Sequence, residues 1–241
     1  MSEPRNVICF DRVTKSFGTQ TVLRQLNLNI TQGEFVGLVG VNGAGKTTLI
    51  KSLFDLCDIN SGTIKLFGTS HTQADSRERV MYLPERFAAP QHLTGNDFIT
   101  YMLQIHGAHR NQKKLDNILD ILQLNKQVLN KPVRTYSKGM TQKLGLAVCF
   151  ISNKALFVLD EPMSGLDPQA RLSFKRLLQN EKAQNHTVLL STHALSDIEK
   201  ICDRMVVLHD GIWKYDGTPK EFISRYDTAD YDAAFMKCIN S

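Results

Sequence analysis

The segment from Gly40 to Thr48 constrains this chain more than any other, because it matches the phosphate-loop pattern G-x-x-x-x-G-K-[ST]. It follows the apolar run Glu34–Val39 and precedes a helix that we predict over Lys46–Phe54, which is the context this pattern requires. Glycines let the backbone curl, so successive N–H groups point at phosphate oxygens, and the helix N-terminus adds the positive end of its dipole. The sequence therefore predicts a nucleotide phosphate site on a strand–loop–helix unit.

Two side chains of this loop have specific expected roles. Lys46 is expected to reach the β- and γ-phosphates, and the Thr47 hydroxyl is expected to ligate Mg²⁺. The rest of the loop should contribute backbone and side-chain contacts to the nucleotide, through Gly40, Asn42, Gly43, Ala44, Gly45 and Thr48.

Two acidic residues follow a second apolar run, Leu156–Leu159. A buried parallel strand presents its carboxyl end at the edge of the sheet where ligands bind, so Asp160 is expected beside the phosphate loop as a contact to Mg²⁺. Glu161 comes one residue later and could polarise a water for attack on the γ-phosphate, a form of assistance worth about 10²–10⁴ in rate.

The order of apolar runs predicts an α/β fold. Short strands separated by glycines fill the first third, among them Thr21–Ile30, whose partial alternation favours an antiparallel strand. Helical character dominates from Asp97 to Val148, with i, i+3, i+4, i+7 apolar spacing over Leu115–Leu122. In the last third, strands at Leu156–Leu159 and Val188–Leu190 flank a predicted helix, Gln169–Lys182. The pattern indicates a nucleotide-binding core that carries a helical lobe.

Further short motifs occur in an order that closely resembles the ATP-binding cassette (ABC) ATPases, over about Val7–Phe222. Tyr136–Met140 is similar to the signature LSGGQ, Ser164–Asp167 to the D-loop, and Ser191–His193 to the end of the H-loop strand. The resemblance implies a P-loop NTPase core with an N-terminal antiparallel β-subdomain and an inserted α-helical subdomain. It places the core at 1–90 and 150–225, the helical signature subdomain at 91–149, and a C-terminal tail at 226–241.

The resemblance also implies roles for residues outside the phosphate loop. Phe17 would stack on adenine, and His193 would hold the γ-phosphate or the attacking water. In this family two cassettes meet head to tail, so Ser137 and Gly139 would donate to ATP held by a second cassette. Asp167 would communicate between the two sites. ATP and Mg²⁺ are the implied cofactors, and a homodimer or a pair with a related cassette is the implied assembly.

Two departures from the family pattern indicate a subclass. The signature carries Lys138 where glycine is usual, and Glu85 stands where the Q-loop usually has glutamine, so it would offer the metal a charged oxygen. The combination of Tyr-Leu-Pro-Glu with Tyr-Ser-Lys-Gly-Met resembles cassettes of drug, antibiotic, and lipid or polysaccharide exporters. The implied function is ATP hydrolysis to ADP and phosphate, driving export by a separate integral-membrane permease bound near Glu85–Gly95.

Charge and hydropathy agree with a peripheral location at the cytoplasmic face of the cell membrane. No run approaches the roughly 20 apolar residues of a membrane span, and the polar segment 1–6 lacks the apolar part of a secretory signal. Five scattered cysteines without a C-x-x-C pair favour reduced thiols. The net charge of +5 concentrates in 102–143, where Asp116 and Asp120 oppose a basic set. The members of that set are Arg110, Lys113, Lys114, Lys126, Lys131, Arg134, Lys138 and Lys143.

No nucleic-acid module accompanies this basic lobe, so we expect it to face the nucleotide of the second cassette rather than DNA or RNA. Two alternatives stay open. The chain could be a soluble ABC-type ATPase without a permease, such as an iron–sulfur-assembly-like ATPase. The tail Ser224–Ser241 could be a dimer contact, although a frayed end is favoured because termini are commonly disordered. A non-hydrolysing subunit is disfavoured, because Lys46, Asp160, Glu161 and His193 are all present.

Overall fold

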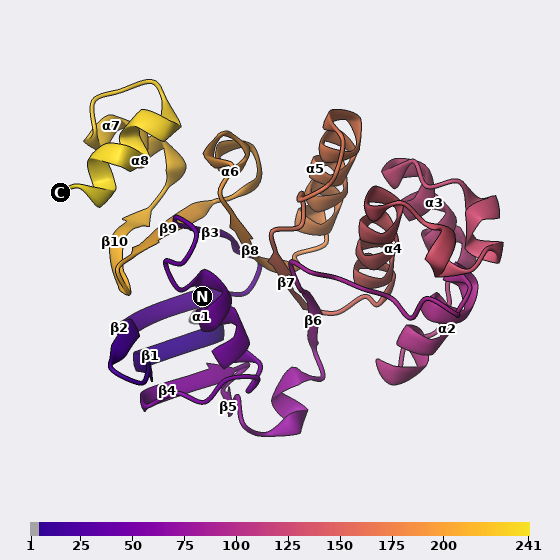
Figure 1. Cartoon of the computed structure of the whole chain (residues 1–241), viewed down its shortest axis with the longest axis horizontal. Coiled ribbons are helices and arrows are strands. Elements are labelled where there is room, and N and C mark those ends of the chain that lie inside the picture. Colours follow the sequence, from indigo (N-terminus) through magenta and orange to yellow (C-terminus); the bar gives the residue numbers. More distant parts are fainter. Residues whose placement is uncertain (1–4) are drawn as a thin grey trace.

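Glycine turns divide the first part of the chain into the strands of a small antiparallel sheet (Figure 1). The computed structural model describes residues 5–241. Residues 1–4 lie outside the described range, and they are part of the N-terminal segment in which no secretory signal was expected. The four strands lie in the order β2-β1-β4-β5. Their bounds are β1 Asn6–Phe17, β2 Gln20–Thr31, β4 Ser61–Leu66 and β5 Thr69–Ser70. Buried and exposed side chains alternate over Leu26–Ile30, as the predicted antiparallel strand requires.

Apolar runs without alternation form a second, six-stranded sheet in the order β10-β9-β3-β8-β7-β6. Five of these strands run parallel to one another: β3, β6, β7, β8 and β9. The edge strand β10 pairs antiparallel with β9. Every residue of β3 and β7 is buried, because helices or the first sheet cover both faces. The bounds are β3 Phe35–Val39, β6 Val80–Leu83, β7 Leu156–Asp160, β8 Thr187–Thr192, β9 Arg204–His209 and β10 Ile212–Gly217.

The six-stranded sheet separates two hydrophobic cores. Helix α1 (Lys46–Leu53) packs with the antiparallel sheet on one face, where Val36 and Leu38 of β3 point. Phe35 and Val39 point to the other face, onto the second core. The helices that supply that core are α2 Gly95–Ile105, α3 Gln112–Leu122, α4 Lys138–Ile151, α5 Pro168–Ala183 and α6 Leu195–Ile201. Helices α2, α3 and α4 lie together at one end of the molecule, beyond β6 (Figure 1). Among residues 5–241 no helix is long and apolar enough to cross a bilayer.

The C-terminal segment corrects one expectation, because it is helical and packed rather than frayed. Helix α7 (Pro219–Arg225) begins at a capping box formed by Thr218 and Glu221, and α8 (Tyr231–Ile239) follows it. On α8, Ala234, Phe235 and Cys238 are buried against α6, α7 and β10. The apolar residues of the tail therefore complete the second core, which the general tendency of termini to be disordered did not anticipate.

Candidate functional site

The phosphate loop turns sharply into α1 through Gly45, whose φ of 108° lies in the left-handed region. A Cβ at this position would lie 3.1 Å from the Val22 carbonyl oxygen, so a larger residue would be both strained and crowded. Lys46 is buried, and its Nζ donates to the carbonyl oxygens of Gly40 (2.6 Å) and Val41 (3.2 Å). Burial lowers the pKa of Lys46, although Glu161, Asp160 and Glu85 oppose that shift by attraction.

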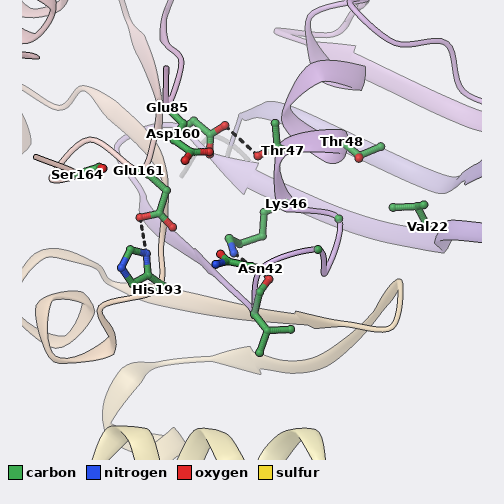
Figure 2. A pocket seen from close by; sticks show the side chains of 13 residues that line it. Val22, Asn42, Lys46, Thr47, Thr48, Glu85, Asp160, Glu161, Ser164 and His193 are labelled. Carbon is green, nitrogen blue, oxygen red and sulfur yellow. Dashed lines mark hydrogen bonds and ion pairs between the residues drawn. The ribbon is translucent and has the colours of Figure 1, made fainter. Parts of the chain in front are cut away.

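Asp160 lies at the carboxyl end of β7, directly beside the first turn of α1. Its carboxylate accepts from Thr47 Oγ1 at 3.2 Å (Figure 2). It also accepts from Ser191 Oγ, on β8, at 2.5 Å. Burial raises the pKa of Asp160, and these two hydrogen bonds partly offset the shift. The parallel register places Asp160 opposite Ser191, so three chain segments converge on one carboxylate.

Glu161 follows with a left-handed backbone, φ 48°, which is uncommon for a non-glycine residue. Its backbone N–H donates to the same Ser191 hydroxyl (2.9 Å). Its side chain turns toward His193, where Glu161 Oε2 and His193 Nδ1 are 2.9 Å apart (Figure 2). The histidine side chain is 70% exposed whereas that of Glu161 is 12% exposed, so the pair lies at the mouth of the site.

These groups line one cavity of about 480 Å³. Most of the residues expected from the sequence are part of its wall: Asn42, Gly43, Gly45, Lys46, Thr47, Thr48, Glu85, Asp160, Glu161 and His193. Gly40 contacts the cavity indirectly through Lys46, and Ala44 is buried beneath the loop. Val22, Val41 and Ser164 also line the cavity and were not expected there. Val41 lies within the phosphate-loop pattern and Ser164 in the D-loop-like segment, whereas Val22 carried no sequence signal.

Four expected residues outside the phosphate loop also do not line this cavity: Phe17, Ser137, Gly139 and Asp167. Phe17 is 53% exposed, with the Lys15 ammonium 4.7 Å from the centre of its ring. Ser137 caps α4 by accepting from the Met140 N–H (3.2 Å). Asp167 caps α5 by accepting from the Ala170 N–H (2.8 Å), and that hydrogen bond lowers its pKa.

A second hollow of about 590 Å³ adjoins the cavity and lies between the segment that follows β6 and the start of α4. Glu85 and Ser164 line both hollows, so the groove leads directly to the acids of the first cavity. Phe87 and Tyr136 form an apolar part of its wall, and Arg86, Arg134 and Lys138 supply basic groups.

The donor set fits Mg²⁺ held together with a phosphate. Thr47 Oγ1 and the Asp160 carboxylate are hard oxygen donors 3.2 Å apart, and Mg²⁺ commonly takes one or two carboxylates and completes its shell with substrate phosphates and waters. Among residues 5–241 no group of three or more His, Cys, Asp or Glu could hold a metal unaided. A cation beside Asp160 would also favour the ionised carboxylate, whose pKa burial has raised.

Comparison with known proteins agrees with this geometry. Residues 23–164 match the family model described as ABC transporter. An uncharacterized ABC transporter ATP-binding protein of Synechocystis is 38% identical over 78% of this chain and 54% of that protein. The bacitracin transport ATP-binding protein BcrA of Bacillus licheniformis is 34% identical over 83% of this chain and 65% of that protein.

The chain thus spans about half to two thirds of the length of these two relatives. A solved ATP-binding subunit of an ABC transporter superposes with a TM-score of 0.87 and 28% identity, covering 96% of this chain and 99% of that one. The expected α/β cassette fold is confirmed, and the chain belongs to the ABC transporter family.

Proposed function

We propose that this chain hydrolyses ATP to ADP and phosphate and thereby drives export through a separate membrane permease. The observation that carries the proposal is the convergence of Lys46, Thr47, Asp160 and Glu161 on one cavity behind a strand–loop–helix unit. Phosphoryl transfer needs positioning, a cation and a group that orients water, and these side chains can supply all three requirements.

Glu161 is the proposed general base, and His193 holds the γ-phosphate or the attacking water beside it. Their 2.9 Å separation lets one ring nitrogen and one carboxylate oxygen contact the same small molecule at the cavity mouth. Lys46 neutralises phosphate charge from within the loop. Its present acceptors are backbone carbonyls, which a phosphate oxygen can replace with a charge-assisted hydrogen bond.

Thr47 and Asp160 are the proposed Mg²⁺ ligands, with Glu85 as a third oxygen donor from the Q-loop position. Glu85 lies on the cavity wall, close enough to raise the pKa of Asp160 by repulsion. Bound Mg²⁺ would stabilise the charge that develops on the phosphates. A charged Q-loop residue strengthens attraction for the cation relative to glutamine.

A second cassette is needed to complete the nucleotide site. Ser137, Gly139 and Asp167 lie outside the cavity, which fits a head-to-tail pair in which the signature of one protomer contacts ATP held by the other. The basic side chains of the helical lobe would face the phosphates in that assembly. We propose the core at 1–90 and 150–225 and the helical subdomain at 91–149, with Phe17 stacking on adenine.

The proposed permease site is the groove beside Glu85, between the core and the helical lobe. It is partly apolar, it has basic groups on its rim, and it shares Glu85 with the nucleotide cavity. The likeness to a bacitracin transport ATP-binding protein supports the exporter subclass. The chain would then act as a peripheral protein at the cytoplasmic face of the membrane.

Phosphate release from Mg-ATP by the purified chain tests the proposal. We expect Glu161→Gln to reduce turnover to a small residual rate, retain ATP binding and accumulate an ATP-dependent dimer on size exclusion, because glutamine cannot accept the water proton. Glu199→Gln, at an exposed glutamate of α6, is the matched control and should behave as wild type. Unchanged turnover in Glu161→Gln would remove Glu161 from the base role, and no turnover in wild type would contradict the ATPase assignment.

A further inference from the structure

We propose that Gln142 is a positioning residue for Glu161, a role that rests on the proposed function of Glu161 as the general base. The carboxamide of Gln142 donates from Nε2 to the carbonyl oxygen of Pro162, the residue that follows Glu161, at 3.0 Å. A proline carbonyl can only accept, so the NH₂ group is necessarily the donor. Gln142 thereby fixes the Pro162–Met163 peptide, one residue downstream of the proposed base.

The backbone of Glu161 needs such a restraint. Its φ of 48° is a conformation that costs a non-glycine residue free energy and persists only where the surrounding structure determines it from several sides. Ser191 holds the N–H of Glu161 from the core side, at 2.9 Å. Gln142, which lies on the helical lobe, holds the carbonyl oxygen of Pro162. Between these two anchors the side chain of Glu161 is directed toward His193.

Burial makes the Gln142 contact strong. The residue is 6% exposed, and its hydrogen bond to Pro162 is itself buried. Water cannot readily replace a partner at such a site, so loss of the donor would leave the Pro162 carbonyl unsatisfied and destabilise the local conformation. The strained backbone of Glu161 would then have one fewer restraint.

Packing around Gln142 joins the start of α4 to the loop after Glu161. The aliphatic stem of Lys138 lies against Gly165, where a Cβ would be 3.1 Å from Lys138 Cε. A Cβ on Gly139 would be 3.3 Å from the Gly165 carbonyl oxygen. The signature end of α4 and the segment Pro162–Gly165 are therefore in direct contact. In the proposed dimer, the signature that contacts ATP of the partner cassette is thus joined to the base of its own chain.

Gln142→Met tests this role, because methionine keeps the length of the side chain and removes the donor. We expect kcat for ATP hydrolysis to fall roughly ten- to hundredfold, the effect of misplacing a catalytic group by about 1 Å. ATP affinity should stay within about twofold, since no binding contact is removed. Gln184→Met is the matched control: exposed Gln184 also donates from Nε2 to a backbone carbonyl, that of Asn180, but far from the cavity.

Two further measurements separate positioning from a general loss of structure. In a Glu161→Gln background, Gln142→Met should not lower the residual rate further, because the group that Gln142 positions is already disabled. In Gln142→Glu, only the protonated carboxyl can donate to Pro162. The ratio of variant to wild-type kcat should therefore rise as pH falls from about 8 to about 6, since burial raises the pKa of a carboxyl.

An unchanged kcat in Gln142→Met, a parallel loss of ATP affinity, or a full further loss in the Glu161→Gln background would overturn the proposal. If Gln142→Met does not fold, the Gln142→Glu titration decides, and a flat ratio counts against positioning. Failure of the proposed function is a different result, because it would appear as absent turnover in wild type or full turnover in Glu161→Gln.

Discussion

Two buried serines provide a direct test of how the acidic site is held together. Ser191 and Ser52 are both 0% exposed. Ser191 Oγ donates to Asp160 (2.5 Å) and accepts from the Glu161 N–H (2.9 Å). Ser52 Oγ, on α1, has no hydrogen-bond partner within residues 5–241. Replacing either serine by alanine removes one buried hydroxyl oxygen, so the loss of packing is similar in the two variants. The difference in their free energies of unfolding therefore reports the hydrogen bonds of Ser191.

The expected difference is large. Ser191→Ala loses a hydrogen bond to a charged group and leaves a buried N–H unsatisfied, which together should lower the free energy of unfolding by roughly 2–5 kcal/mol. For a domain of this size each kcal/mol shifts Tm by about 2–4 °C, so Tm should fall by roughly 4–20 °C. Ser52→Ala should leave Tm unchanged or slightly higher, because it removes a buried polar atom that has no partner.

Thermal unfolding followed by circular dichroism, without nucleotide and at about pH 7.5, measures both shifts. Urea unfolding provides an independent comparison of midpoints at equal slope. Equal shifts for the two variants, or a larger fall for Ser52→Ala, would refute the inference that the Ser191 hydroxyl links Asp160 to Glu161.

Three further predictions concern charges in the cavity. Lys46→Ala should weaken ATP binding strongly, since one charge pair at about 4 Å is worth about 4 kcal/mol at an effective dielectric near 20, before desolvation; titration with a fluorescent ATP analogue measures the change. Glu85→Gln should keep hydrolysis but raise the Mg²⁺ concentration for half-maximal activity by about threefold or more, because a neutral oxygen attracts the cation less. Burial raises the pKa of Asp160, so the folded state holds this proton at a pH where the unfolded chain has released it. Stability from this group is therefore lost as pH rises through its folded pKa, and urea unfolding between about pH 4 and 7 should show a pH-dependent stability difference from Asp160→Asn.

Local patterns were enough to predict the phosphate loop and three of the buried parallel strands. The glycine pattern at 40–48 lies between a buried strand and α1, and apolar runs at 156–159 and 188–190 mark β7 and β8. Such signals depend on neighbours in the chain, where periodicity and turn residues act directly. Strand β6 (Val80–Leu83) was not predicted as a strand.

Contacts between residues far apart in the sequence could not be predicted from local patterns. Ser191 lies 31 residues from Asp160, and the resemblance of Ser191–His193 to the H-loop implied a role for His193 but none for the serine. Its role arises only from the register that places β8 beside β7. Gln142 likewise reaches Pro162 across 20 residues of chain, after the helical lobe has packed against the core. Helix α8 was misjudged for the same reason, since Phe235 gains its burial from elements far upstream.

Two charged groups of the cavity, Lys46 and Asp160, lie in environments that disfavour their charged forms. Burial lowers the pKa of Lys46 and raises the pKa of Asp160, so each group is shifted toward its neutral form. Phosphate oxygens beside Lys46 and Mg²⁺ beside Asp160 would each favour the charged form, so binding of Mg-ATP should stabilise the fold. A neutral residue in place of Asp160 would relieve the buried charge at the expense of the metal site. Burial of Asp160 therefore lowers stability at this site, and nucleotide binding recovers it, a compromise that is common at functional sites.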